Sequence, residues 1–600
     1  MVYYRIQSVP DTARFLRKEA DKMVEKALTG YPSVDKPWLK YYSKEAINAP
    51  LPECTAYELL QRGNEGHSDD VALIYFDRKI TYGQLLDGIE KAARAFAALG
   101  VRRGDIVIMC VINMPETVYA LYALDRLGAV ANMVDPRTNA SQLRDYISEC
   151  EAKFAVTVGL AYPVMRQAAK GTGVEKIVVT DPADSLPPLK RMAYRLKNRG
   201  SKPGADDMRW AEFISLGAFT TPEYAPYEKD RCFLIAHTGG TTGIPKGVML
   251  SDDNINAVAH GYKYIDIPFE RQQKYFDDLP PFIVYGLSLA IHTALCYGLQ
   301  VILYPIFSPR EFPKLFRKYK PNHFCDVADH FRYLTEDPLT ADMKLPFLIT
   351  AGVGGDTLNS ETESVFNDYL RRNGCRYKAV KGYGMTELCA TGVTAFGKAN
   401  AIGSVGVPFA ANTVKIVDMD TGRELGYDKT GEIWISAPSA MLGYYKKPNE
   451  TAEVVVTDEN GKRWVKTGDL GRINTDGLVF HEGRIRRIYL TAFDGQPAKI
   501  FPGLIESAVR ELPDVYDCTA VARFMPGSTC YEPVAYVILH TEHMPMDAVM
   551  KELHGICAER LPTYMQPVEY RFVTEFPKTA IGKVDYRTLE RMAAENTSGR

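Results

Sequence analysis

The sequence predicts an α/β protein with a large N-terminal domain and a small C-terminal domain. Over the first two thirds of its 600 residues, amphipathic helices alternate with short apolar strands, the pattern of βαβ units in a mostly parallel sheet covered on both faces. From about residue 411, short strands are instead joined by Gly and Asp turns, as in an antiparallel sheet. A final run of helices and strands is long enough for a separate α+β domain.

The first βαβ unit is the clearest. Apolar residues recur at three- and four-residue steps near Thr81 to Leu99, which predicts an amphipathic helix that Gly100 ends. A buried strand is expected over residues 105–113, a helix near 116–127 and a short strand at 129–135.

The alternation continues along the chain. Further apolar strands are expected at residues 153–159, 176–181, 232–238, 300–305 and 347–352. Antiparallel strands are expected at 413–426, 431–437 and 477–490. The C-terminal elements are expected at 504–512, 518–524, 533–540 and 547–561. We place the domain boundary at about residues 484–489, which gives domains 1–485 and 486–600.

One segment is long and apolar enough to suggest a membrane span. Residues 279–309 contain no Asp, Glu, Lys or Arg. Gly286, His292, Gly298 and Pro305 interrupt the run, however. We therefore predict a buried helix, a break at Gly298 and a buried strand, with no transmembrane segment.

Composition excludes some partners. The net charge of −2 gives no basic footprint for nucleic acid. The eleven cysteines are scattered without a Cys-x-x-Cys pair, which favours reduced thiols and a cytoplasmic location over a disulfide framework. One sequence does not indicate the oligomeric state.

A glycine-rich stretch after the strand at 232–238 has the composition of a phosphate-binding loop. Its glycines allow close backbone approach to an anion, and its hydroxyls and one lysine add donors and charge. A surface turn would explain the glycines but not the hydroxyls beside a lysine. A Walker loop is excluded because Pro245 and Gly247 flank Lys246. The candidate phosphate-binding residues are Thr238, Gly239, Gly240, Thr241, Thr242, Gly243 and Lys246.

This stretch resembles the phosphate-loop signature of the adenylate-forming enzymes, the superfamily of acyl-CoA synthetases, luciferases and nonribosomal-peptide adenylation domains. Gly239 stands where the family often has Ser. Four more stretches resemble family motifs, in the order in which the family has them. The resemblance covers about residues 55–589. Within the family, the sequence is most similar to fatty acyl-CoA ligases. It implies a large domain of parallel sheets with a small barrel-like subdomain, followed by a mobile C-terminal domain.

The resemblance also implies a nucleotide site. In "KGYGMTE", Tyr383 would stack on adenine beside Gly384, Thr386 would touch phosphate and Glu387 would bind Mg²⁺. An aromatic face suits a flat base, and a hard carboxylate suits magnesium. In "AGVGGDTL", the neighbours of adenine would be Gly354, Gly355 and Asp356.

Three further positions follow from the resemblance. Asp469 would accept hydrogen bonds from the ribose hydroxyls, with Arg484 as a second ribose or phosphate contact. Lys583 matches the catalytic lysine of the small domain, and Arg487 occupies the hinge position. Leu490 departs from the family, which often has Lys there, and the loop after it looks slightly longer than usual.

The implied chemistry has two half-reactions. A carboxylate attacks the α-phosphorus of ATP, giving an acyl-adenylate and pyrophosphate. The thiol of coenzyme A then attacks the acyl carbon and expels AMP. Lys583 and a Mg²⁺ ion at Glu387 would offset the repulsion between carboxylate and phosphates, and catalysis would consist mainly of positioning and charge stabilisation.

The acid pocket is expected to be apolar, without a second basic group. Its predicted wall residues are Phe282, Ile283, Tyr285, Gly286, Val327, Ala328 and Gly352. This set favours a hydrophobic acid such as a fatty acid, while an aryl or sterol-derived acid stays open. Asp326 and Asp329 have no assigned role, and solvation at the surface is their alternative explanation.

Three functions therefore compete. An AMP-forming acyl-CoA ligase leads. An enzyme of the same fold would pass the acyl group to a separate carrier protein or stop at acyl-AMP. The third is a catalytically silent nucleotide or acyl-CoA binder, against which Lys246, Glu387, Asp469 and Lys583 argue.

Overall fold

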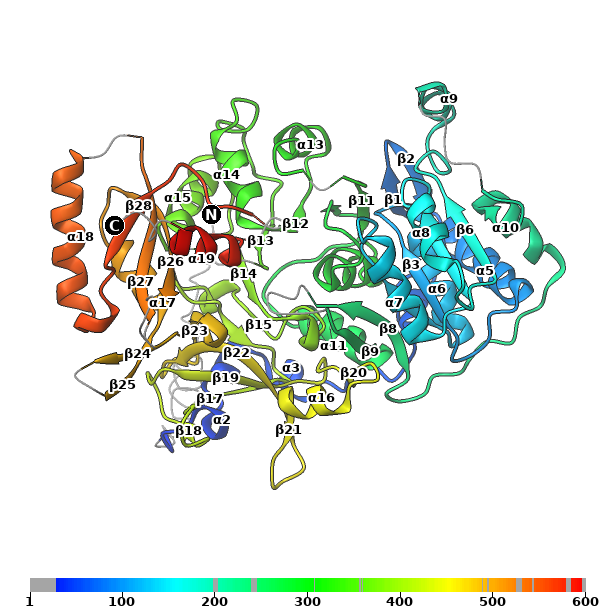
Figure 1. Cartoon of the computed structure of the whole chain (residues 1–600). Helices are drawn as coiled ribbons and strands as arrows, with labels where there is room; N and C mark the ends of the chain where they lie inside the picture. Colours follow the sequence, from blue (N-terminus) through cyan, green and yellow to red (C-terminus); the bar gives the residue numbers. More distant parts are fainter. Residues whose placement is uncertain are drawn as a thin grey trace, which may run out of the picture.

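The structure is a computed structural model, and Figure 1 shows it with residues 71–216 on the right and the C-terminal part on the left. It describes residues 28–197, 203–238, 245–306, 308–355, 358, 360–487, 489–493, 496–524, 531–541, 544–578 and 584–595.

The first large sheet has eight strands in the order β20-β9-β8-β4-β3-β5-β6-β7. They are β3 (Ile106–Cys110), β4 (Val130–Met133), β5 (Phe154–Val158), β6 (Lys176–Thr180), β7 (Met208–Arg209), β8 (Cys232–His237), β9 (Gly247–Ser251) and β20 (Gly443–Tyr444). In this sheet β9 is antiparallel to both of its neighbours, β8 and β20, and the other strand pairs are parallel. The predicted parallel βαβ pattern is confirmed here.

The second large sheet has nine strands in the order β16-β15-β14-β13-β12-β10-β11-β1-β2. They are β1 (Val71–Tyr75), β2 (Arg78–Thr81), β10 (Lys274–Asp277), β11 (Gln300–Leu303), β12 (His323–Asp326), β13 (Thr350–Val353), β14 (Val380–Tyr383), β15 (Val393–Thr394) and β16 (Val407–Pro408). The strands from β1 to β14 in this order pair in parallel. The carboxyl ends of β10, β12, β13 and β14 therefore meet at one edge, where parallel sheets bind ligands.

Helices cover these sheets. They include α4 (Ala56–Gly63), α5 (Tyr82–Leu99), α6 (Pro115–Leu127), α7 (Ala140–Cys150), α8 (Tyr162–Ala169), α10 (Trp210–Leu216), α11 (Asp252–Lys263), α13 (Phe312–Tyr319), α14 (Ala328–Glu336) and α15 (Ser360–Arg372). Helix α9 (Pro188–Lys197) instead projects away from the sheets at the top right of Figure 1. Helix α5 begins and ends as predicted: Thr81 forms a capping box with Gln84, and Gly100 has a φ of 102°.

Most of the described residues in the uncharged segment 279–309 are buried, although Ile306 near its end is 57 % exposed. It forms a π-helix (Gly286–Thr293), the short α12 (Ala294–Cys296) and the strand β11. Gly298, with a φ of 73°, makes the break between them. Among the described helices, none has the length and apolarity that a membrane crossing requires.

A third sheet is antiparallel, as predicted. It contains β17 (Thr413–Val417), β18 (Glu424–Leu425), β19 (Gly431–Ser436), β21 (Val455–Thr457), β22 (Arg463–Ile473) and β23 (Val479–Arg484). Strand β22 lies between β19 and β23 and carries Asp469.

The C-terminal residues have their own hydrophobic core. The hairpin β24 (Tyr489–Phe493) and β25 (Gln496–Ile500) precedes a three-stranded sheet of β26 (Val515–Phe524), β27 (Tyr531–Leu539) and β28 (Glu569–Phe572). Its helices are α17 (Pro502–Val509), α18 (Met546–Arg560) and α19 (Tyr586–Glu595). The buried cluster between them contains only residues from 489 onwards. The domain boundary after residue 485 stays a prediction.

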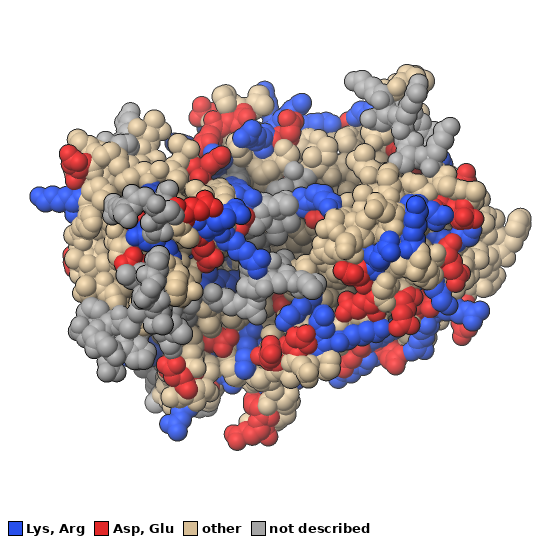
Figure 2. All heavy atoms as spheres, in the orientation of Figure 1, with Lys and Arg blue, Asp and Glu red and all other residues tan. Residues whose placement is uncertain are grey.

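Among the described residues, contacts of α15 and β23 join this C-terminal part to the rest. His540 Nε2 lies 3.0 Å from Glu361 Oε1 in α15. Gly503, in α17, packs so closely on β23 that a Cβ there would lie 2.1 Å from the carbonyl oxygen of Glu482. On the face shown in Figure 2, basic and acidic side chains are interspersed over both parts.

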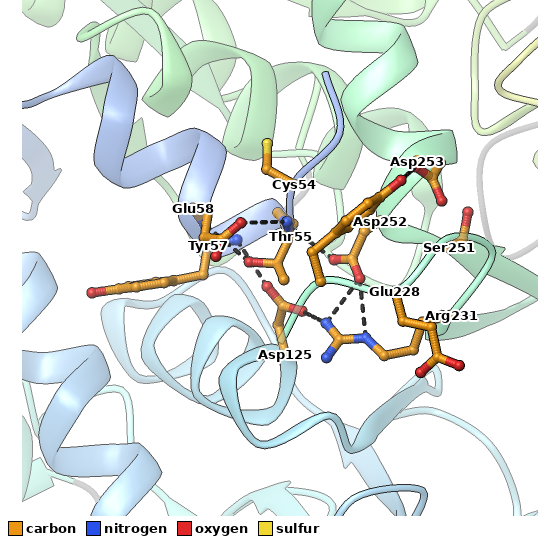
Figure 3. Close-up of polar contacts among 12 residues, drawn as sticks. Cys54, Thr55, Tyr57, Glu58, Asp125, Glu228, Arg231, Ser251, Asp252 and Asp253 are labelled. Carbon is orange, nitrogen blue, oxygen red and sulfur yellow. Dashed lines mark hydrogen bonds and ion pairs between the residues drawn. The ribbon is translucent and has the colours of Figure 1, made fainter. Parts of the chain in front are cut away.

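A buried arginine joins four elements of the large part (Figure 3). The Arg231 guanidinium, immediately before β8, pairs with Asp125 of α6 and with Asp252 of α11, its Nη2 lying 2.8 Å from Asp252 Oδ2. The same carboxylates accept the first amides of α4: Asp252 Oδ1 from Ala56 N at 2.9 Å and Asp125 Oδ2 from Tyr57 N at 2.8 Å. Burial raises the pKa of both carboxyls, while the charge of Arg231 acts in the opposite direction.

We expect Arg231→Met to destabilise the protein by about 3–5 kcal/mol, because it leaves two buried carboxylates without their cation. Urea unfolding would measure the loss. Arg103→Met is the matched control, since its ion pair with Glu228 is more than half exposed, and its cost should be about 0–1 kcal/mol. Equal losses in the two variants would contradict this account.

Candidate nucleotide and acid site

The predicted phosphate loop is the turn of a hairpin between β8 and β9. At its base, Thr238 N donates to the carbonyl oxygen of Lys246 at 3.0 Å, and Lys246 N donates to Thr238 Oγ1 at 3.2 Å. These bonds close the neck of the loop. Residues 239–244 lie outside the described residues, so the roles of Gly239, Gly240, Thr241, Thr242 and Gly243 stay predictions.

His237 supports the start of this loop, a role that the sequence did not indicate. Its Nε2 lies 2.7 Å from Asn132 Oδ1, and its ring centroid lies 4.0 Å from that of Tyr146. Burial lowers the pKa of His237 to about 4. The ring is therefore neutral at pH 7 and adds no charge to the loop.

The structure brings Lys246 close to Glu387 through Tyr444. The Lys246 ammonium lies 4.7 Å from the centre of the Tyr444 ring, and the Tyr444 hydroxyl donates to Glu387 Oε1 at 2.7 Å. Glu387 is only 6 % exposed, and it follows Thr386 in a short 3₁₀ helix (Thr386–Leu388). Tyr444 arrives from β20, which pairs with β9 beside the loop.

A second cluster forms around Asp469, which is 1 % exposed. The Tyr383 hydroxyl donates to Asp469 Oδ2 at 2.7 Å, and Arg484 Nε lies 2.9 Å from Asp469 Oδ1. Asp469 and Arg484 are cross-strand partners of β22 and β23. His481 Nε2, 3.8 Å from Asp469 Oδ1, is an additional neighbour that the sequence did not indicate.

These neighbours keep Asp469 ionised. Burial alone would raise its pKa, but the nearby His481 ring, the charge of Arg484 and the hydrogen bond from the Tyr383 hydroxyl together hold the pKa below its usual value. A buried, charged acceptor therefore lies beside the end of β14.

The two clusters are joined by the turn after β14. Gly384 stands between Tyr383 and the 3₁₀ helix that carries Glu387. A Cβ on Gly384 would lie 1.9 Å from the carbonyl oxygen of Ala390, so position 384 has no room for a side chain. The charged groups of Lys246, Glu387, Asp469 and Arg484 thus converge on the carboxyl end of β14.

The neighbouring strand β13 ends in the predicted adenine-contacting turn. Gly354 N donates to the carbonyl oxygen of Asp326 at 3.0 Å, and Gly355 has a φ of 79°. A Cβ on Gly354 would lie 2.9 Å from the Tyr285 hydroxyl oxygen. Asp356 lies outside the described residues.

A small cavity with a mostly apolar, aromatic wall lies beside this turn. Its wall consists of Tyr262, Phe269, Tyr275, Tyr285, Leu289, Thr293, Ala294, Tyr297, Leu299, Cys325, Thr350, Gly352, Val353, Val380, Gly382 and Thr394. A Cβ on Gly352 would lie 2.3 Å from Cys325 Sγ, so only glycine fits there.

Two of the seven predicted pocket residues, Tyr285 and Gly352, line this cavity. The other five are not in its wall: Phe282, Ile283, Gly286, Val327 and Ala328. Gly286 faces Leu279 instead, and Ala328 packs with the core around α13 and α14.

Asp326 corrects one sequence expectation. Solvation at the surface was the alternative for this residue, but it is 1 % exposed, because β12 carries it into the protein interior. The side chain of Asp329 is not among those described.

The predicted hinge residue is held by the C-terminal part. Arg487 Nη2 donates to Glu506 Oε1 and to the carbonyl oxygen of Ala520, both at 2.5 Å, and its guanidinium lies 3.9 Å from the centre of the Tyr586 ring. Lys583 and the side chain of Leu490 lie outside the described residues, so the role of Lys583 stays a prediction.

Comparison with known proteins identifies the family of the chain. Residues 60–445 match the family of AMP-binding enzymes. The chain belongs to this family. Residues 504–583 also match the C-terminal domain of AMP-binding enzymes. The predicted α/β fold and the predicted class of AMP-forming acid–thiol ligase are thereby confirmed.

Individual relatives span nearly the whole chain. A long-chain-fatty-acid–CoA ligase of Bacillus subtilis (strain 168) is 29 % identical over 94 % of this chain and 99 % of its own length. A probable 4-coumarate–CoA ligase 1 of Dictyostelium discoideum is 26 % identical over 92 % and 97 %.

Solved structures share the fold. The anthranilate CoA ligase AuaEII in complex with anthranoyl-AMP superposes with a TM-score of 0.74 at 21 % identity, covering 91 % of this chain and 99 % of that one. ATP-bound MatB from Rhodopseudomonas palustris also gives 0.74 at 21 % identity, covering 90 % and 99 %.

We expect Asp469→Asn to weaken ATP binding about 10- to 100-fold, because an ionised acceptor is lost at a buried position. Isothermal titration would measure the affinity, and thermal melting would show whether the variant folds. Asp476→Asn is the control, since Asp476 is an exposed partner of Lys40. Equal ATP affinities for the two variants would contradict the assignment.

Proposed function

We propose that the protein activates a hydrophobic carboxylic acid as an acyl-adenylate, with release of pyrophosphate, and then transfers the acyl group to coenzyme A. Membership of the AMP-binding enzymes supports the adenylation chemistry. The fatty-acid and aryl-acid CoA ligases among the relatives support coenzyme A as the acceptor.

One observation carries this proposal. Gly352 and Val353 line the aromatic cavity, and Gly354, the next residue, lies in the turn assigned to adenine. An acid in the cavity and a nucleotide at the ends of β13 and β14 would therefore meet across one short stretch of backbone. Holding two reactants in this way replaces an encounter in solution by a reaction within one complex.

The described residues have definite parts in this proposal. Tyr383 would stack on adenine, and Asp469 with Arg484 would hold the ribose. Lys246 and Thr238 would hold the β- and γ-phosphates from the base of the hairpin, and Thr386 would contact phosphate. Before ribose binds, the Tyr383 hydroxyl occupies one oxygen of Asp469, so ribose would take over that hydrogen bond.

Glu387 fits a role as magnesium ligand. It is a buried carboxylate with one oxygen held by Tyr444, and hard cations prefer such oxygens. Bound Mg²⁺ would neutralise charge on the phosphates. Lys246 would add a second cation on the other side of Tyr444.

The cavity favours an acid without a second charged group, since the described residues of its wall include no Lys, Arg or His. This composition supports a hydrophobic tail such as that of a fatty acid. The rings of Tyr262, Tyr275, Tyr285 and Tyr297 favour an aryl acid as the second candidate, because flat rings pack well on aromatic faces. A sterol-derived acid and transfer to a separate carrier protein are further alternatives.

A cytoplasmic location fits this function. All ten cysteines in the described part of the chain are free thiols, and most are buried. Free thiols persist in a reducing compartment, where ATP and coenzyme A are also available.

Pyrophosphate release with a panel of acids, with and without coenzyme A, tests the proposal. We expect release to depend on a hydrophobic acid, and the acyl-CoA product to appear only with coenzyme A. Comparing saturated fatty acids with aryl acids would separate the two substrate candidates. Absence of pyrophosphate release with every acid would refute the proposed activity.

A substitution tests the role of Lys583 separately. We expect Lys583→Ala to lower adenylation about 100-fold or more, because the cation beside the attacking carboxylate is lost, while thioester formation from supplied acyl-AMP largely survives. Lys551→Ala, an exposed lysine on α18, is the control. Equal retention of both half-reactions in Lys583→Ala would refute the role.

A further inference from the structure

Three metal-ligating side chains meet at the carboxyl ends of β10 and β12, outside the nucleotide site and the cavity wall. Asp278 directly follows β10, Asp326 ends β12, and His330 lies one turn into α14. Their exposed fractions are 2 %, 1 % and 0 %. His330 Nε2 lies 3.1 Å from Asp278 Oδ2, and its Nδ1 lies 3.2 Å from Asp326 Oδ1.

Strand alternation separates this cluster from the acid cavity. Tyr275 and Cys325 point into the cavity, while Phe276 and Phe324 point to the opposite face of the sheet. Asp326 follows Cys325 and so shares the face of Phe324. The ring of His330 accordingly packs edge-on against Phe312 of α13, at 4.9 Å between centroids.

The charge in this region is not balanced by protein cations. Asp277, the last residue of β10, is also buried, with 1 % of its surface exposed. Together with Asp278 and Asp326 it makes three buried carboxyl groups at the ends of β10 and β12. In the described part of the chain, none of these three carboxyls forms an ion pair with a lysine or arginine. Buried carboxylates normally pair with a cation or coordinate a metal.

Unsatisfied oxygens make a second, independent observation. Asp278 Oδ1 and Asp277 Oδ2 are buried acceptors that receive no hydrogen bond from the described residues. Such groups are rare in native proteins, and an ion or water is a common explanation for them. They leave lone pairs available at this edge of the sheet.

The ligand set and its spacing fit a metal ion. One ligand atom each from Asp278, Asp326 and His330 lie within 4.8 Å of one another. A tetrahedral ion with bonds of about 2.1 Å needs ligand atoms about 3.4 Å apart, so the three side chains would have to draw together around the ion. Two carboxylates with one imidazole suit Zn²⁺ or Mn²⁺ better than Mg²⁺ or Ca²⁺, which prefer oxygen ligands alone.

We propose that Asp278, Asp326 and His330 form a structural site for a divalent transition-metal ion, distinct from the magnesium site at Glu387. The ion joins the end of β10 to the end of β12 and to α14. The carbonyl oxygen of Asp326 accepts a hydrogen bond from the Gly354 amide. Asp278 begins the stretch of chain, residues 278–285, that leads to Tyr285 in the cavity wall. The site therefore fixes two segments that border the cavity and the nucleotide turn.

Metal analysis of tag-free, full-length protein tests the site. After dialysis against metal-free buffer without chelator, the nucleotide-free protein should retain about one equivalent of Zn²⁺ or Mn²⁺. His330→Gln and Asp278→Asn should each retain less than about a fifth of that amount. His67→Gln is the matched control, since His67 also faces an aspartate, Asp70, but is half exposed; its metal content should equal that of the wild type.

Cobalt and melting experiments keep the test independent of how well the variants fold. Wild-type protein stripped with a chelator should develop a visible d–d absorption band with added Co²⁺, and added Zn²⁺ should raise its melting temperature by several degrees, as expected for a ligand bound only by the native state.

Wild-type protein that contains no metal and takes up neither ion would overturn the proposal. It would show that protonation neutralises the cluster, consistent with burial and the charge of Asp278 raising the pKa of Asp326. Equal metal loss in His67→Gln would overturn it as well.

Discussion

The large part of the molecule depends on a buried pairing of one guanidinium with two carboxylates. Arg231 stands at the entrance to β8, the strand that leads directly to the phosphate loop. Through Asp125 and Asp252 it fixes α6 and α11, and the same carboxylates hold the first turn of α4. Loss of one partner from a buried charge network is strongly destabilising, so this network holds its elements in a fixed arrangement. The direction of β8 is therefore set by contacts at the start of the strand, away from the site.

The site itself follows from strand ends. Strands β13 and β14 are parallel neighbours, so their carboxyl ends place Gly354 beside Tyr383 without any long-range loop. Close packing around glycine then shapes the edge, since Gly352 and Gly384 have no room for a Cβ. Charge arrives from other sheets: Asp469 from β22, Arg484 from β23, and Lys246 from the hairpin beside β9.

Local signals in the sequence predicted the helices and strands well. They did not predict contacts between residues that are distant in the sequence. The helix from Thr81 to Gly100 was predicted because its cap and its glycine stop are local. Tyr383 and Asp469 were found because each lies in a short motif. Tyr444 has no such motif, and it reaches Glu387 only because β20 pairs with β9, about two hundred positions earlier in the chain.

The cavity shows the same limit. Tyr262 and Tyr297 come from two helical segments that become neighbours only when the sheet is covered, so nothing in their local sequence marks them as wall residues. Asp326 was ambiguous for a related reason. A single aspartate among mixed residues resembles a surface position, and only the pairing of β12 between β10 and β13 buries it.

The close approach of Gly503 to Glu482 has a consequence for how the two parts of the chain fit together. The backbone of α17 packs directly against the backbone of β23. This close contact is possible because residue 503 has no side chain. A Cβ at that position would clash with the carbonyl oxygen of Glu482. The packing of α17 on β23 therefore requires glycine at position 503, and even one methyl group there would force the two backbones apart.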